Sequence, residues 1–268
     1  MIKPFYNQLK KKLLEGKMTA GCWAQLVNSI SAEAMARQGF DWVLIDMEHA
    51  PNDLSTLITQ VQAVSGTSAS TVVRAPWNDF VVIKRILDTG VHGVIIPYVN
   101  NPEELNNAIK ACKYPPEGIR GIAGSHRACG FGQEIKSYVP YANNEILIIS
   151  QIETKEAIDN LDEMLKVPGV DGFFIGPMDL ATSLGYLANP QHKNVQKVIR
   201  EIEEKVFAAG KILGTVSGNF ESASALYDRG YQMVTLMSDA VCVAATGSKL
   251  VAQFKEKYSD ELNSEHKE

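Results

Sequence analysis

The stretches ILIISQIE, residues 146–153, and VDGFFIGPMD, residues 170–179, each combine a short apolar run with a carboxylate at its end. Both runs are apolar throughout rather than alternating, as expected for parallel strands that are covered on both faces. Glu153 and Asp179 come just past the ends of these two strands. Carboxylates placed in this way can converge on one cation, so the sequence predicts a hard divalent metal at this edge of the sheet.

Eight apolar runs of this kind alternate with helix-like segments along the chain. The predicted strands are residues 19–26, 42–47, 70–75, 93–99, 146–152, 172–176, 212–217 and 232–237. The predicted helices are residues 31–39, 53–64, 79–90, 101–112, 194–210 and 220–230. Eight alternating units predict a (β/α)8 barrel. An open doubly wound sheet is the alternative, but no G-x-G-x-x-G motif follows the first strand.

Two segments depart from the alternation. Residues 113–144 are rich in Gly and Pro and only weakly periodic, and such a long excursion is more often functional than accidental. Residues 239–258 look helical and precede a charged tail, residues 259–268, which we expect to be solvated. We therefore expect a single barrel domain over residues 1–258.

Composition narrows the classes of function. The 268 residues suit one large domain, and the formal net charge of −5 gives no basic surface for nucleic acid. The apolar runs are shorter than a membrane span, and the lysine-containing N-terminus lacks the apolar region of a signal peptide. The four cysteines are scattered without a C-x-x-C pair. We therefore expect a cytoplasmic protein with reduced thiols.

In a barrel of this kind, the chemistry lies at the carboxyl ends of the strands. The polar residues predicted there include Asp46, Glu48, His49, Arg74, Gln151, Glu153 and Asp179. An aldolase that forms an imine needs a lysine at such a position. None is found at the strand ends, and the nearest, Lys155, lies two residues past Glu153. The residue types therefore favour metal chemistry over a Schiff base.

Five short runs stand at or near the predicted strand ends: FDWVLIDMEH (40–49), VRAP (73–76), YPPEGIRG (114–121), QIET (151–154) and GPMDL (176–180). Together they resemble the HpcH/HpaI family of class II pyruvate aldolases, and the resemblance extends from about residue 15 to 255. The resemblance implies a modified (β/α)8 barrel and a hexamer. It also implies that the last helix, residues 239–258, packs on a neighbouring subunit.

The resemblance further implies a metal site and a substrate site. Glu153 and Asp179 match the metal ligands, and oxygen-only ligation suits Mg²⁺ or Mn²⁺, with Co²⁺ as a further candidate. The substrate would be a 2-oxo acid. Gln151 matches a residue that contacts it, and Met178 and Asp179 would donate backbone N–H groups to its carboxylate.

Three further residues match the catalytic groups of the family. His49 matches the general base, Asp88 matches the carboxylate that raises the basicity of this histidine, and Arg74 matches the residue that stabilises charge on the oxo group. The implied reaction is the reversible cleavage of a 4-hydroxy-2-oxo acid to an aldehyde and pyruvate, through a pyruvate enolate held by metal and arginine.

Each assignment has a structural alternative. A strand-end carboxylate is often a helix cap or part of a surface ion pair, and Arg74 could brace Asp46 or Glu48. Asp88 could lie on a solvated helix face. Trp23 and Trp77 could shape the aldehyde pocket, although aromatic core is the better interpretation for both.

Two other functions fit a barrel of this kind. A CoA-thioester lyase of the citrate lyase beta or malyl-CoA type would share the two metal carboxylates, but those relatives lack the D-M-E-H stretch at residues 46–49. A non-catalytic or assembly role is the third hypothesis, and it is disfavoured because every expected polar position is filled.

Overall fold

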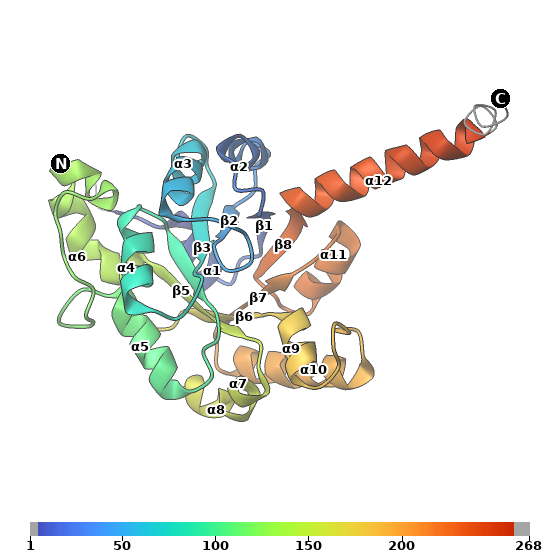
Figure 1. Cartoon of the computed structure of the whole chain (residues 1–268). Coiled ribbons are helices and arrows are strands. Elements are labelled where there is room, and N and C mark those ends of the chain that lie inside the picture. Colours follow the sequence, from blue (N-terminus) through green and yellow to red (C-terminus); the bar gives the residue numbers. More distant parts are fainter. Residues whose placement is uncertain (1–4, 260–268) are drawn as a thin grey trace.

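Eight parallel strands close into a barrel, in the order β1 to β8, in the computed structural model, which describes residues 5–259 (Figure 1). The strands are β1 Thr19–Ala24, β2 Trp42–Asp46, β3 Ser70–Arg74, β4 Gly93–Ile96, β5 Leu147–Ile152, β6 Gly172–Ile175, β7 Ile212–Val216 and β8 Met233–Ser238. The predicted (β/α)8 barrel is therefore confirmed. Each strand lies within the predicted range or differs from it by one residue at an end.

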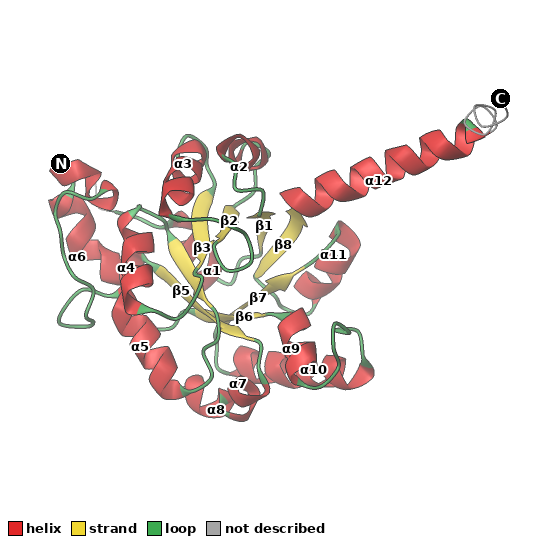
Figure 2. Ribbon diagram, in the orientation of Figure 1, coloured by secondary structure: helices red, strands yellow, loops and turns green. Residues whose placement is uncertain are grey.

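Helices cover the outside of the barrel (Figure 2). The longer ones that follow the strands are α2 Ser29–Ala36, α3 Leu54–Val64, α4 Phe80–Asp88, α5 Pro102–Cys112, α10 Lys193–Ala208 and α11 Phe220–Asp228. Shorter ones are α7 Lys155–Asp159, α8 Leu161–Met164 and α9 Pro177–Ser183. Side-chain caps start several helices. Asp53 and Thr56 form a capping box at α3, and Asn28 caps α2, which begins two residues before the predicted range.

The apolar residues form two layers, one inside the barrel and one between the strands and the outer helices. The inner layer contains Trp42, Leu44, Val72, Ile95, Leu147, Ile149, Phe174, Ile212 and Met233. Gly21 makes room for the largest of these side chains, because a Cβ at this position would lie 2.2 Å from the ring of Trp42. The interior is therefore packed with side chains rather than open, as in other barrels of this class.

A short helix that the sequence analysis did not predict closes the amino end of the barrel. This helix, α1 Gln8–Leu14, adds Leu9 and Leu13 to the inner apolar layer. The N-cap residue Asn7 is fully buried, and its side chain donates to the carbonyls of His92 (2.7 Å) and Glu145 (2.8 Å). The barrel thus has a closed floor at its amino end and a mouth at its carboxyl end.

The 113–144 excursion contains more helix than its weak periodicity indicates. It holds a 3₁₀ segment, η1 Arg127–Gly132, and the helix α6 Ile135–Glu145, which includes Pro140. Arg120 anchors the excursion, since its side chain is fully buried and lies over the rings of Tyr114 and Tyr138.

The last helix, α12 Asp239–Lys257, confirms the helix predicted at residues 239–258 and projects away from the barrel (Figure 1). Asp239 is its one buried residue, and several of its exposed side chains are apolar, among them Val241, Val243, Leu250, Val251 and Phe254. The expected tail, residues 259–268, lies outside the described residues except for Ser259. No helix within residues 5–259 is long and apolar enough to cross a membrane.

Candidate active site

A buried ion pair between neighbouring strands forms one wall of the barrel mouth. Asp46 and Arg74 are register partners at the ends of β2 and β3, and both are almost fully buried. The guanidinium binds the carboxylate through two hydrogen bonds, Nε to Oδ1 at 2.9 Å and Nη2 to Oδ2 at 2.7 Å. Burial alone would raise the pKa of Asp46, but these bonds and the charge of Arg74 lower it below its usual value. Asp46 is therefore an ionised anchor for Arg74.

Glu48 and His49 lie beside this pair. The remaining nitrogen of Arg74, Nη1, lies 2.9 Å from Glu48 Oε2. Burial raises the pKa of Glu48 to about 7. Arg74 opposes this rise, while Glu153, Asp46 and Asp179 add to it. His49 is the exposed member, with 60% of its side chain accessible, and its Nε2 lies 3.9 Å from Glu48 Oε1. Both carboxylates that were candidates to brace Arg74 thus do so.

Glu153 is held from two sides at the end of β5. Its side chain is 1% exposed. Oε1 accepts a hydrogen bond of 2.7 Å from the backbone N–H of Tyr98, and Oε2 accepts one from the side-chain amide of Gln151. Burial raises the pKa of Glu153; the two hydrogen bonds oppose this rise, and the charge of Asp179 adds to it. Several carboxylates therefore share one poorly solvated region.

Asp179 belongs to the first turn of α9, which begins directly after β6. Gly176 precedes this helix, and a Cβ there would lie 3.0 Å from the amide nitrogen of Gln151 and 3.1 Å from Glu153 Oε2. Glycine thus lets the start of α9 approach the two side chains closely. In the described chain, the backbone N–H groups of Met178 and Asp179 donate no hydrogen bond, as is usual in the first turn of a helix.

The donor set at the mouth fits a hard divalent cation with few protein ligands. Within residues 5–259, no three His, Cys, Asp or Glu side chains form a cluster that could hold a metal. However, Mg²⁺ commonly uses one or two carboxylates and keeps several waters. Glu153 and Asp179 supply two carboxylates, and the buried carbonyl oxygen of Gln151 has no hydrogen-bond partner. A cation here would also balance the charge of carboxylates that raise one another's pKa.

The structure separates Asp88 from His49 within one chain. Asp88 ends α4, just before β4, and therefore lies near the floor, whereas His49 follows the end of β2 at the mouth. The carboxylate of Asp88 binds Arg120 at 2.9 Å and lies 3.6 Å from His126 Nε2. Asp88 therefore does not contact the His49 of its own chain, and its carboxylate pairs with Arg120 rather than lying free on a solvated helix face.

The two tryptophans differ in their surroundings. Trp23 is buried as expected, where its ring lies 4.7 Å from the guanidinium carbon of Arg74 and its Nε1 donates to Asp46. Trp77 is 54% exposed and stacks on Tyr98, so the core interpretation is wrong for Trp77. Tyr98 itself was not among the predicted site residues, because a backbone donor leaves no chemical signature in a sequence.

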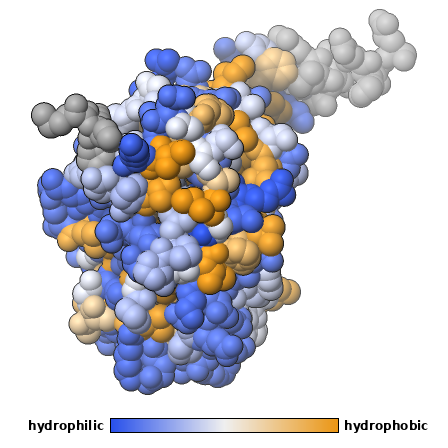
Figure 3. All heavy atoms as spheres, turned by 90° about the vertical axis from the view of Figure 1, so that its left-hand side faces the viewer, coloured by the Kyte–Doolittle hydropathy of each residue, from blue (hydrophilic) through white to orange (hydrophobic). Residues whose placement is uncertain are grey.

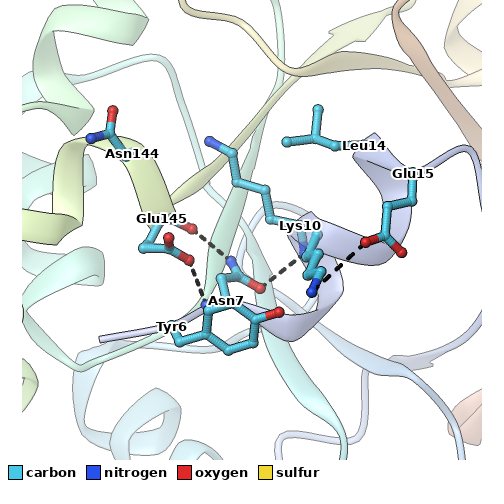
Figure 4. A pocket seen from close by; sticks show the side chains of 8 residues that line it. Tyr6, Asn7, Lys10, Leu14, Glu15, Asn144 and Glu145 are labelled. Atoms are coloured by element: carbon cyan, nitrogen blue, oxygen red, sulfur yellow. Dashed lines mark hydrogen bonds and ion pairs between the residues drawn. The ribbon is translucent and has the colours of Figure 1, made fainter. Parts of the chain in front are cut away.

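A surface cavity of about 270 Å³ lies at the other end of the barrel, between α1 and α6 (Figure 4). Its lining includes Asn7, Lys10 and Glu145. Asn7 and Glu145 bond to each other across it, and Lys10 pairs with Asp171 at 2.9 Å. These polar groups are engaged in closing the floor, so the cavity is not the reactive site.

Comparison with known proteins agrees with the family that the sequence resembles. The family model for HpcH/HpaI aldolase/citrate lyase matches residues 19–245. A 5-keto-4-deoxy-D-glucarate aldolase of Escherichia coli O139:H28 is 41% identical over 251 residues, which cover 94% of this chain and 98% of that protein.

Solved structures agree as well. An HpcH/HpaI aldolase/citrate lyase family protein from Burkholderia cenocepacia J2315 superposes with a TM-score of 0.88 at 31% identity, covering 93% of this chain and 99% of that one. Protein CitE of Mycobacterium tuberculosis, solved with magnesium and pyruvate, has a TM-score of 0.54 at 15% identity over 84% of this chain and 87% of that one, and shares the fold alone. The chain therefore belongs to the HpcH/HpaI aldolase/citrate lyase family and is a carbon–carbon lyase of the aldolase type.

Proposed function

We propose that the barrel mouth binds pyruvate next to a divalent cation and cleaves a 4-hydroxy-2-oxo acid there. The observation that carries the proposal is the buried Glu153, which shares a poorly solvated region with Asp179 and Glu48 and whose charge is influenced by Arg74. Uncompensated negative charge in such a region is unfavourable, so the arrangement suits a bound cation.

Glu153 and Asp179 would hold the cation, with Mg²⁺ or Mn²⁺ favoured over Co²⁺ by the oxygen donors. When bound, the cation supplies positive charge that polarises the keto oxygen of a 2-oxo acid. Gln151 orients Glu153 and leaves its carbonyl oxygen available. The unbonded N–H groups of Met178 and Asp179 would donate to the substrate carboxylate.

Arg74 would stabilise the negative charge that develops on the keto oxygen as the C3–C4 bond breaks. Its orientation is fixed before substrate arrives by Asp46 and Glu48, so little reorganisation is needed during the reaction. His49 is exposed at the mouth, where it would take the proton from the C4 hydroxyl of the substrate. In the direction of synthesis, the same group would remove a proton from the methyl group of pyruvate.

The expected role of Asp88 requires another copy of the chain. Because its own His49 lies at the other end of the barrel, Asp88 could raise the basicity of His49 only in a neighbouring copy, across a subunit interface. We propose a homo-oligomer, a hexamer by the family resemblance, in which α12 packs on a neighbour. The exposed apolar side chains of α12 support this arrangement. The face with α4 and α6 also shows apolar surface (Figure 3), and exposed residues there and in the preceding loop include Val81, Ile119, Ile122, Phe131 and Ile135.

We propose a dicarboxylic sugar acid as the substrate, in line with the Escherichia coli relative. Numbered from its oxo end, 5-keto-4-deoxy-D-glucarate carries a 2-oxo group, a 4-hydroxyl group and a second carboxylate. Cleavage between C3 and C4 would release pyruvate and a three-carbon aldehyde acid. A cytoplasmic location is part of the proposal, supported by four free cysteines, which suit a reducing compartment.

The test is pyruvate release from a panel of 4-hydroxy-2-oxo acids, with and without a second carboxylate. The metal-free protein is assayed alone and after addition of Mg²⁺ or Mn²⁺. We expect release that requires the cation and is fastest with the dicarboxylates. Full activity in the presence of EDTA would exclude the metal mechanism, and equal rates for both substrate sets would exclude the dicarboxylate assignment.

A further inference from the structure

The loop that follows β4 carries an unusual backbone conformation beside the metal carboxylates. Tyr98 has φ = +51°, in the left-handed region that aromatic residues rarely adopt, and its N–H is the donor to Glu153 Oε1. We propose that Tyr98 is a positioning residue that aims Glu153 at the cation, and that Trp77 holds Tyr98 in this conformation. The inference deepens the proposed metal site and rests on it for its consequence, although the hydrogen bond exists without the metal.

The residue before Tyr98 cannot supply the hydrogen bond to Glu153 in its place. Pro97, which precedes it, has no N–H to offer. Glu153 needs donors from the protein because its side chain is 1% exposed and has little access to water. With Gln151 bonded to Oε2, each carboxylate oxygen has one protein donor. The carboxylate is thus oriented from two sides, and its remaining lone pairs are available to a cation.

Asn100, two residues after Tyr98 in the same loop, is held by hydrogen bonds that do not involve Glu153. The backbone N–H of Asn100 donates to Glu104 Oε2 at 2.7 Å, and its carbonyl accepts from the side chain of Asn160 at 3.0 Å. The Asn100 side chain accepts from the hydroxyl of Thr154, the residue next to Glu153. These bonds fix where the loop ends. The side chain of Asn100 also donates a long hydrogen bond of 3.4 Å to the Tyr98 carbonyl, but a bond at the carbonyl does not fix φ, so we infer a further restraint.

The ring of Tyr98 supplies that restraint. It stacks on Trp77 with ring centroids 5.1 Å apart and 30° between the planes. Both rings are well exposed, 40% for Tyr98 and 54% for Trp77, so neither is placed there by burial in the core. Within residues 5–259 the Tyr98 hydroxyl makes no hydrogen bond to the protein. The stacked ring, rather than the hydroxyl, therefore connects the loop after β4 to the loop after β3.

The first test measures amide hydrogen exchange at Tyr98 in the metal-free protein. We expect the amide to be protected in the wild type and in Tyr98→Phe, and to exchange about tenfold faster in Trp77→Ala. Tyr141→Ala is the control, because Tyr141 is a tyrosine of similar exposure, 42%, on α6. Unchanged protection in Trp77→Ala would overturn the proposal. Since no metal is present, this result does not depend on the proposed reaction.

The second test measures the dissociation constant of Mn²⁺ from the electron paramagnetic resonance signal of the unbound ion. We expect binding to weaken about tenfold in Tyr98→Ala and about fivefold in Trp77→Ala, in the range seen for residues that orient metal ligands. Tyr98→Phe should bind like the wild type. Tyr98→Gly should lose only about twofold, because glycine adopts a positive φ readily.

Double variants show whether Trp77 affects Mn²⁺ binding through the ring of Tyr98 or by a general loss of structure at the mouth. If Trp77 acts through the ring of Tyr98, Trp77→Ala adds nothing to Tyr98→Ala or to Tyr98→Gly. A full additional loss in either double variant would overturn the inference. Unfolding curves of all variants, compared with Tyr141→Ala, show whether a change in Mn²⁺ affinity merely follows global stability.

Discussion

Asn7 at the floor of the barrel and Gln151 at its mouth are both buried polar side chains, but their hydrogen bonding differs. At the floor, the amide of Asn7 uses both its donor hydrogens and its acceptor oxygen, accepting from the N–H of Lys10 and donating to two carbonyls. At the mouth, Gln151 Oε1 is buried without a hydrogen-bond partner, and Glu48 Oε2 has an ion pair but no hydrogen bond. Satisfied groups stabilise the fold, whereas acceptors left open at the mouth remain available to a cation or substrate.

The largest expected effect comes from exchanging one carboxylate at each end. Glu153→Gln removes the charge but keeps the shape, so Mn²⁺ binding should weaken by more than about 100-fold and pyruvate formation should fall about a thousandfold. Glu145→Gln is the matched change at the floor, where Glu145 accepts from the N–H of Asn7. It should cost about 1 kcal/mol of stability and leave Mn²⁺ affinity unchanged. Equal Mn²⁺ binding by Glu153→Gln and the wild type would show that Glu153, like Glu145, is not a metal ligand.

A smaller effect is expected from Arg74→Lys, which keeps the charge at the mouth but not the two-pronged geometry. We expect kcat to fall about 100-fold, because a lysine cannot bind Asp46 through two nitrogens and hold a third toward Glu48. Stability should fall by about 2 kcal/mol as Asp46 loses a buried donor. Steady-state kinetics and urea unfolding measure the two effects. An unchanged kcat with reduced stability would make Arg74 part of the scaffold, like the groups of the floor.

The smallest effect concerns pH and belongs to the floor. Burial, assisted by the positive charge of Arg127, lowers the pKa of His92 to about 4 from its ordinary 6.5. Below pH 6.5 the unfolded chain therefore takes up a proton that the folded chain does not, and stability is lost as the pH falls toward 4. His92 Nδ1 accepts from the N–H of Thr71, and asparagine at this position can accept in the same way.

We therefore expect His92→Asn to lose about 2 kcal/mol less than the wild type between pH 6.5 and pH 4, measured by urea unfolding. The pyruvate-forming activity at pH 7.5 should be the same in both proteins. Parallel stability curves across this range would show that His92 is protonated equally in the folded and unfolded chains.

Most of the barrel could be predicted because buried parallel strands are apolar throughout and the intervening helices end in recognisable caps. The floor could not. Helix α1 buries only Leu9 and Leu13 among lysines, which is too few apolar positions to establish a period. Helix α6 contains Pro140 and few buried residues, so its periodicity is weak. In both cases the stabilising contacts are made with residues distant in sequence, such as Asn7 with Glu145.

The mouth shows a similar division. The positions of Arg74, Glu153 and Asp179 could be predicted because residues at or just past the carboxyl end of a barrel strand lie at the mouth of the barrel. The partner of Asp88 could not be predicted, because Arg120 is 32 residues away in an irregular segment. The positive φ of Tyr98 is equally hidden, as a tyrosine gives no sign of left-handed backbone.

The first residue of α12, Asp239, limits how far the chain can be truncated from its C-terminal side. Asp239 accepts from the N–H groups of Gln25 and Leu26 and from the hydroxyl of Ser31. Its carboxylate thus holds the segment after β1, more than 200 residues earlier in the chain. A stop codon after Asp239 would remove the rest of α12 and keep the hydrogen bonds of the Asp239 carboxylate. A stop codon one position earlier would release the rim of the mouth as well.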